Sequence, residues 1–134
     1  MPGTRTIDAV DLLVEKINEN RYGIEFVRDA WLNKAPENYG VAELNGEPEQ
    51  LWADGHLIDS VWRVVLTLYV KGADDSYPAE IQGILETLEM DGILDTTHTI
   101  SRSFDMDTGK VRWTWQISLY GPLERTVAAE EDDD

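Results

Sequence analysis

The stretch SVWRVVLTLYVK, residues 60–71, is the clearest β-strand of the sequence. Successive side chains of a strand point to opposite faces, so the large apolar residues at the even positions from 62 to 70 share one face, which we expect to line the core. The opposite face is mixed and consists of Val61, Arg63, Val65, Thr67, Tyr69 and Lys71. In a single chain the apolar residues of this face would be exposed to solvent, so we expect the face to be half-exposed or buried in an assembly.

Two segments flanking this strand have the apolar spacing of amphipathic helices. The first runs from Ile7 to Ile17, with Thr6 as its expected N-cap. The second begins near Pro78 and ends at Asp91-Gly92. Its apolar stripe consists of Ile81, Ile84, Leu85 and Leu88.

The remaining periodic segments predict further strands. We expect them over residues 24–32, 41–44, 50–53, 96–104 and 110–120. The dipeptide Asn45-Gly46 favours a tight turn, because both residue types tolerate positive φ, and so predicts a protruding hairpin of 41–44 with 50–53. The order predicts an α+β fold, an antiparallel sheet with two amphipathic helices on one face. Residues 1–125 would form the single domain, and residues 126–134 a disordered acidic tail.

The charge excludes several functions. The 134 residues include 27 acidic and 11 basic side chains, a formal net charge of −16. Such a chain is a poor general binder of nucleic acid or of anionic lipid, both of which require Lys and Arg. Neither a membrane-spanning apolar run nor a signal-peptide core is visible, and there is no cysteine. A reducing intracellular setting fits best, with no disulfide framework.

Candidate catalytic and metal-binding patterns have simpler structural explanations. Asp105-x-Asp107-x-Gly109 resembles the start of an EF-hand loop, but its glycine is one position early, and we expect a hairpin turn. Asp54, His56 and Ser60 are neighbours around a turn without a nucleophile motif. Paired carboxylates are common by chance in so acidic a chain. We therefore expect no catalytic residue, metal site or cofactor.

Five tryptophans are the most unusual feature beside the charge. Strand parity places Trp62, Trp113 and Trp115 on core faces. Trp52 differs, because its predicted hairpin arm is too short and polar to build a core. It either contacts another subunit, since tryptophan is enriched at interfaces, or packs under its own hairpin.

Three short motifs stand in the middle of the chain: YGVAEL at 39–44, LWADG at 51–55 and VVLTLYV at 64–70. Together with the order of elements over residues 6–122, they resemble the small neck and tail-completion proteins of tailed bacteriophages, with the tail terminator as the closest type. The resemblance implies a virion protein without catalytic residues. It implies a homo-oligomeric ring, usually a hexamer, that caps the tail tube and joins it to the head connector.

The resemblance also implies where the ring contacts lie. The hairpin near 41–53, which carries Leu44, Leu51 and Trp52, would reach a neighbouring subunit, and Val61, Val65 and Tyr69 would face an assembly. Its partners would be the tail-tube protein and neck proteins. An acidic lumen would let genomic DNA pass without binding, and no membrane is involved.

Two alternatives remain open from the sequence. The first is an acidic inhibitor, a DNA mimic or immunity-type protein that binds a basic partner. The second is a small enzyme with an acid pair that uses Asp54, His56 or Asp105.

Overall fold

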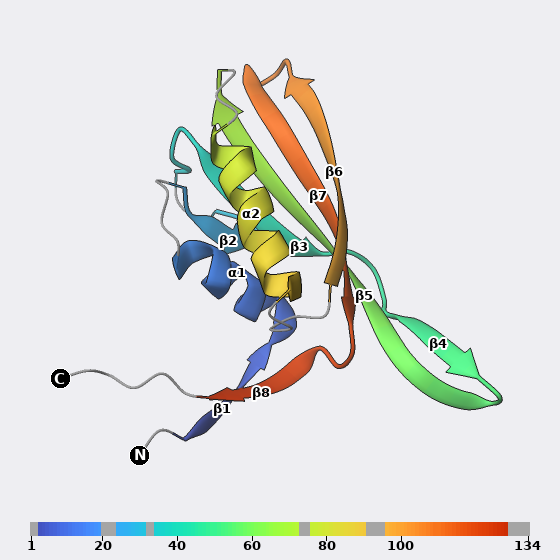
Figure 1. The fold of residues 1–134 in the computed structure, drawn as a ribbon. Coiled ribbons are helices and arrows are strands. Elements are labelled where there is room, and N and C mark those ends of the chain that lie inside the picture. The colour runs from blue at the N-terminus through green and yellow to red at the C-terminus, as the bar shows by residue number, and fades with distance from the viewer. Residues whose placement is uncertain (1–2, 20–23, 32–33, 73–75, 91–95, 129–134) are drawn as a thin grey trace.

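The computed structural model describes residues 3–19, 24–31, 34–72, 76–90 and 96–128. It has the α+β fold that the sequence predicts, with a mixed sheet that is mostly antiparallel (Figure 1). The elements in chain order are β1 (Thr4–Asp8), α1 (Ala9–Glu19), β2 (Phe26–Arg28), β3 (Tyr39–Leu44), β4 (Glu49–Ala53), β5 (His56–Lys71), α2 (Ser76–Met90), β6 (Thr96–Asp105), β7 (Lys110–Tyr120) and β8 (Glu124–Ala128).

Strand β5 organises the main sheet. The strand order is β2-β3-β5-β7-β6, and β4 also pairs with β5. The neighbours run antiparallel, except for the parallel pair of β2 and β3. β2 is shorter than the predicted strand over 24–32, because the φ of 69° at Asp29 takes the chain out of the extended conformation.

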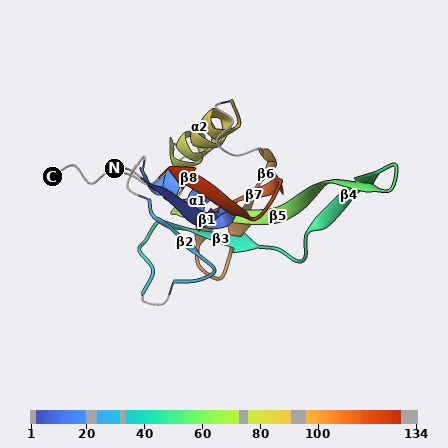
Figure 2. The same ribbon diagram turned by 90° about the horizontal axis from the view of Figure 1, so that it is seen from below.

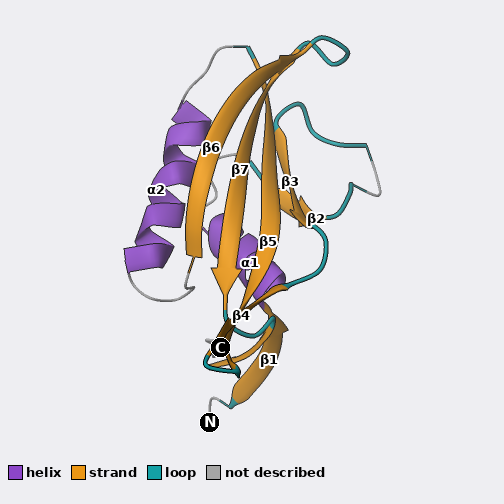
Figure 3. Cartoon of the chain, turned by 90° about the vertical axis from the view of Figure 1, so that its right-hand side faces the viewer, coloured by secondary structure: helices purple, strands orange, loops and turns teal. Residues whose placement is uncertain are grey.

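Both helices lie on one side of this sheet, as Figure 2 shows. On that side the predicted core face of β5 is confirmed, with Trp62 half-buried against the core and the apolar residues from Val64 to Val70 buried. The predicted apolar stripe of α2 is buried as well. Neither helix covers the opposite side, which we call the open face; Figure 3 shows the strands of this face side by side with α1 behind them.

Residues 39–71 form one long irregular hairpin, which corrects the predicted turn. β3 and β4 do not pair with each other; β3 pairs with residues 64–69 of β5, and β4 pairs with residues 56–61. The hairpin closes at Asp54-Gly55, whose φ values of 51° and 76° suit a two-residue type I′ turn. Asn45-Gly46 instead lies in a bulge, because residues 45–48 stand opposite only residues 62–63 of β5.

The two ends of the chain form a second, two-stranded sheet. β1 pairs antiparallel with β8, from Thr4 opposite Ala128 to Asp8 opposite Glu124. The predicted disordered tail is therefore wrong for residues 126–128, whereas 129–134 lie outside the described residues. The predicted N-cap is also wrong. Thr6 lies within β1, and Asp8 caps α1 by accepting a hydrogen bond from the Val10 amide at 2.7 Å. The predicted helix end at Asp91-Gly92 lies outside the described residues.

Removing this cap should weaken the fold. The Asp8 carboxylate also lies 3.2 Å from the Arg28 guanidinium, so it joins the start of α1 to β2. We expect Asp8→Ala to lower the free energy of unfolding by about 0.5–2 kcal/mol. Asp8→Asn keeps the capping oxygen and should lose clearly less. Urea denaturation followed by circular dichroism measures both, and an Asp8→Asn variant as unstable as Asp8→Ala would show that the ion pair, not the cap, matters.

Candidate interaction surfaces

A two-stranded arm projects from the body of the protein (Figure 1). β7 pairs with β5 only as far as Val61, which stands opposite Tyr120. Just beyond that point the Ser60 carbonyl accepts a hydrogen bond from the Gly121 amide at 2.8 Å, and from Asp59 to His56 the strand partner of β5 is β4. We define residues 47–60 as the arm. An isolated two-stranded hairpin is marginally stable in water, which makes a projecting pair of strands an unusual structure for a protein that works alone.

Trp52 lies on this arm. Its side chain is 59% exposed, so the expectation that it packs under its own hairpin does not describe the single chain. The pairing of β4 with β5 shifts register between Leu51 and Trp52, which marks an irregularity at this position. A large apolar side chain exposed on a projecting arm is typical of a binding surface.

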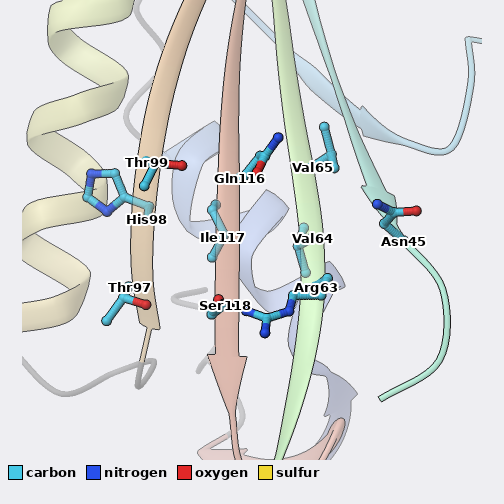
Figure 4. Close-up of a pocket in the computed structure, with 10 residues that line it drawn as sticks. All are labelled: Asn45, Arg63, Val64, Val65, Thr97, His98, Thr99, Gln116, Ile117 and Ser118. Carbon is cyan, nitrogen blue, oxygen red and sulfur yellow. Dashed lines mark hydrogen bonds between the residues drawn. The ribbon is translucent and has the colours of Figure 1, made fainter. Parts of the chain in front are cut away.

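The open face carries a shallow groove of about 410 Å³. Figure 4 shows its lining, with the Arg63 side chain extended toward Ser118 and the His98 ring turned the other way, toward α2. The residues that line it are Asn45, Arg63, Val64, Val65, Thr97, His98, Thr99, Gln116, Ile117 and Ser118. Arg63 is engaged, because it donates to the Ser118 hydroxyl and lies 2.7 Å from a Glu49 carboxylate oxygen. The groove is thus lined by polar and apolar groups in similar measure, and its cation is already paired.

An aromatic cluster covers the far end of the open face. The rings of Tyr39 and Tyr69 are stacked with their centroids 4.9 Å apart, and the rings of Trp31 and Tyr39 form a T-shaped pair with centroids 6.2 Å apart. The Lys110 ammonium lies 4.9 Å from the centre of the Tyr39 ring, within cation–π range. Burial raises the pKa of the Tyr39 hydroxyl, and Tyr69 and Asp105 raise it further. The hydroxyl therefore stays protonated near neutral pH.

The residues predicted to contact a neighbour do not share one surface. Val65 and Tyr69 are half-buried on the open face. Leu44 is half-buried on the helix side, where it packs against the core. The side chain of Leu51 lies outside what the structure describes.

The expectation that Val61 is exposed to solvent in a single chain is wrong. Its side chain is only 3% exposed in the single chain. It stands opposite Glu49 of β4 on one side and Tyr120 of β7 on the other. Directly opposite side chains lie on one face and in contact range, so these two cover it, and the sequence around Val61 alone does not reveal them.

A hydrogen-bond chain that the sequence did not predict joins α2 to the sheet. The Trp115 indole N–H donates to the Gln82 carbonyl oxygen at 2.9 Å, which turns the amide nitrogen toward His98 Nε2 at 2.8 Å. His98 Nε2 therefore accepts, and its Nδ1–H donates to the Glu89 carboxylate. The spacing of Gln82 and Glu89, seven residues apart on α2, places them on one helix face, but their strand partner is not visible locally.

The EF-hand-like motif over residues 105–109 has the geometry of a hairpin turn. The Asp105 carboxylate accepts from the Asp107 amide at 2.9 Å, and the Asp105 carbonyl accepts from the Gly109 amide at 2.8 Å, as in a hairpin turn. Among the described residues, no three His, Asp or Glu side chains are grouped so that they could hold a metal ion. The side chain of His56 lies outside what the structure describes.

Charge is unevenly distributed along the chain. Residues 60–71 and 96–120, which form most of β5, β6 and β7, contain five of the 11 basic residues and only two of the 27 acidic ones. This part carries a net charge of +3, although the whole chain carries −16. The central strands are therefore where copies of this acidic protein would repel one another least.

No protein-family model matches this sequence, and no curated protein matches it either. Neither helix in the described part of the chain is long and apolar enough to cross a membrane. The functional interpretation therefore depends on the arm, the open face and the distribution of charge, together with the family resemblance of the sequence.

Proposed function

We propose that this protein is a structural virion protein of a tailed bacteriophage. In this proposal its copies form a ring, hexameric in the form that the resemblance implies, which terminates the tail tube and joins it to the head connector. Genomic DNA passes through the lumen. The partners are other copies of the chain, the tail-tube protein and neck proteins, and the role is structural rather than enzymatic.

The projecting arm is the observation that best supports an assembly role. It places an exposed Trp52 beyond the last three-stranded part of the sheet. A two-stranded arm with an exposed tryptophan gains stability when a second protein surface covers it. The half-buried Val65 and Tyr69 on the uncovered side of the sheet are compatible with further contacts in the same assembly.

The charge fits a channel for DNA. Phosphates are repelled by a wall of carboxylates, so DNA that passes through an acidic lumen does not bind to it. The net charge of −16, together with the cationic excess in the central strands, allows a ring whose subunits meet near the strands while acidic surfaces face the lumen. In this proposal Asp and Glu residues that lie outside both the central strands and the arm line that inner wall.

Sedimentation velocity of the purified chain tests the ring. We expect a particle with several times the mass of the 15.2 kDa chain, either alone or after mixing with tail-tube protein. Negative-stain electron microscopy of the same sample should show rings with a central hole. A chain that stays monomeric at high concentration and does not join tail tubes would contradict the proposal. A monomer that instead binds a basic protein with steep salt dependence would favour the acidic-inhibitor alternative.

A further inference from the structure

The exposed large apolar side chains of the described residues gather at two places, apart from Met90 at the end of α2. Ile100, Phe104 and Met106 lie along the outer part of β6 and in the turn that follows it, and their side chains are 44%, 60% and 86% exposed. We call these three residues the hairpin end. The second place is the arm, which carries Trp52.

These two surfaces lie too far apart to cover each other within one chain. Through β7, Phe104 is level with Val70 of β5, whereas Trp52 pairs with Leu57 of β5. The separation of 13 residues along one strand corresponds to about 43 Å at roughly 3.3 Å per residue. Figure 1 shows the arm and the β6–β7 turn at opposite ends of the sheet. The two surfaces can therefore contact each other only between different molecules.

The hairpin end also lies on an unprotected sheet edge. β6 is the terminal strand of the main sheet, and its register with β7 runs without a shift from Thr96 to Asp105. It contains neither proline nor lysine, and it has no bulge, so three of the usual devices that keep edge strands from pairing are missing from this strand. Such an edge accepts an added strand, and β4 on the arm has a free edge as well.

The charges of the two surfaces are complementary. The arm contains four acidic residues and no basic one. On β6, Arg102 stands between Ile100 and Phe104 on the same face, and its guanidinium lies 5.6 Å from the centre of the Trp113 ring. Arg102 is exposed, so an acidic arm seated on Ile100 and Phe104 brings its carboxylates toward a cation, whereas Asp105 and Asp107 lie farther along, on either side of Met106.

We propose that the arm of one copy docks on the hairpin end of the next copy, with Trp52 packed on Ile100 and Phe104. The inference rests on the proposed ring, because it needs copies that associate. The two surfaces differ and lie at opposite ends of the chain, so the contact is heterologous: each docking leaves a free arm on one copy and a free hairpin end on the other. Such a contact repeats from copy to copy, and it closes into the proposed ring when the rotation between neighbours divides a full turn.

Two single substitutions and their mixture test this contact. Trp52→Ala removes the exposed indole of the arm, and Phe104→Ser removes the largest apolar side chain of the hairpin end. Each substitution should weaken self-association roughly tenfold or more, as measured by sedimentation velocity. Met90→Ala is the matched control, because Met90 is 87% exposed and lies away from both surfaces, and it should assemble like the unmodified chain. Unchanged melting temperatures would show that both test variants fold.

Mixing the two variants distinguishes a head-to-tail contact from a symmetric one. The intact arm of the Phe104→Ser chain should dock on the intact hairpin end of the Trp52→Ala chain, and growth should stop at two chains, about twice 15.2 kDa. Full assembly by both single variants would overturn this contact and leave the ring proposal standing. An unmodified chain that stays monomeric at high concentration and does not join tail tubes would overturn both proposals.

A photo-crosslinker at position 52 identifies the occupant directly. Irradiation of the assembled protein should link position 52 to a peptide from residues 96–110 of a second copy, which isotope labelling of one population distinguishes from a link within the chain. A link to a different region, or only to a different protein added with it, would contradict the proposal.

Discussion

Replacing Trp115 by alanine is expected to lower the free energy of unfolding by about 3–5 kcal/mol. The side chain is fully buried at 0% exposure, so its loss leaves a large cavity beneath the helices. The substitution also removes the indole N–H that donates a hydrogen bond to the Gln82 carbonyl oxygen. The Gln82 side chain then loses the bond that orients it toward His98, and so the hydrogen-bond chain to Glu89 is weakened. Domains are stable by only about 5–15 kcal/mol, so most of the margin could be lost. Thermal unfolding should show the melting temperature lowered by roughly 10–20 °C.

Trp52→Ala is the matched control for this substitution, because it removes the same residue type from an exposed site. We expect its free energy of unfolding to stay within about 0.5 kcal/mol of the unmodified chain, while its assembly fails. Trp115→Phe separates the two causes, since it keeps most of the volume but not the N–H donor. Equal stability of the Trp115→Ala and Trp52→Ala chains would contradict the position of Trp115 at the centre of the core.

The fold class could be predicted because its central elements carry their own patterns. The alternation over residues 60–71 and 110–120 and the stripe of Ile81, Ile84 and Leu88 depend on local periodicity, which burial on one face imposes directly. These segments are the ones that form the sheet and cover it. Their agreement with the structure reflects the fact that one face of each contacts the same core.

Long-range pairing was not visible in the same way. The segments TRTID at 4–8 and ERTVA at 124–128 are short and mixed, and neither is a strand without the other. The apolar spacing from Ile7 therefore predicted a helix start that pairing with β8 moves to Ala9. The sequence does predict a turn at Asp54-Gly55, but the expected pairing of 41–44 with 50–53 across Asn45-Gly46 is wrong, because both dipeptides favour turns and only the register with β5 decides which one closes the hairpin.

The candidate interaction surfaces were predicted only in part. The unusual setting of Trp52 was recognisable because a polar, short segment cannot bury an indole. The hairpin end was not predicted, since strand parity places Ile100 and Phe104 on one face but does not tell how far a helix extends over it. The exposure of side chains at the edge of a sheet depends on the length and position of the helix that covers it. The sequence of residues 96–104 contains no information about that helix.

Substitution of Gly40 by alanine is expected to destabilise the fold by about 1–3 kcal/mol through overpacking. A Cβ at this position would lie 2.4–2.5 Å from three carbon atoms of the Phe26 ring. The ring is only 1% exposed and has no room to withdraw. Gly40 and Phe26 are also register partners in the parallel pair of β3 and β2, so moving either backbone costs pairing. Chemical denaturation measures the loss.

Gly83→Ala is the matched control, because it is the same substitution at a position that has room for the added methyl group. Gly83 is exposed within α2, and an added Cβ would meet nothing within 4 Å, so the change should stabilise the protein by about 0.5–1 kcal/mol. Phe26→Leu should make Gly40→Ala less harmful than it is beside Phe26, and a double-mutant cycle measures this coupling. Additive effects of the two changes would mean that the ring and the glycine are not in contact, and that β2 does not pack on β3 as described. If the effect of the double substitution differs clearly from the sum of the two single effects, the Phe26 ring and Gly40 are in contact and β2 packs on β3. Because β3 pairs with β5, this contact joins the packing around α1 to the strand that extends into the arm.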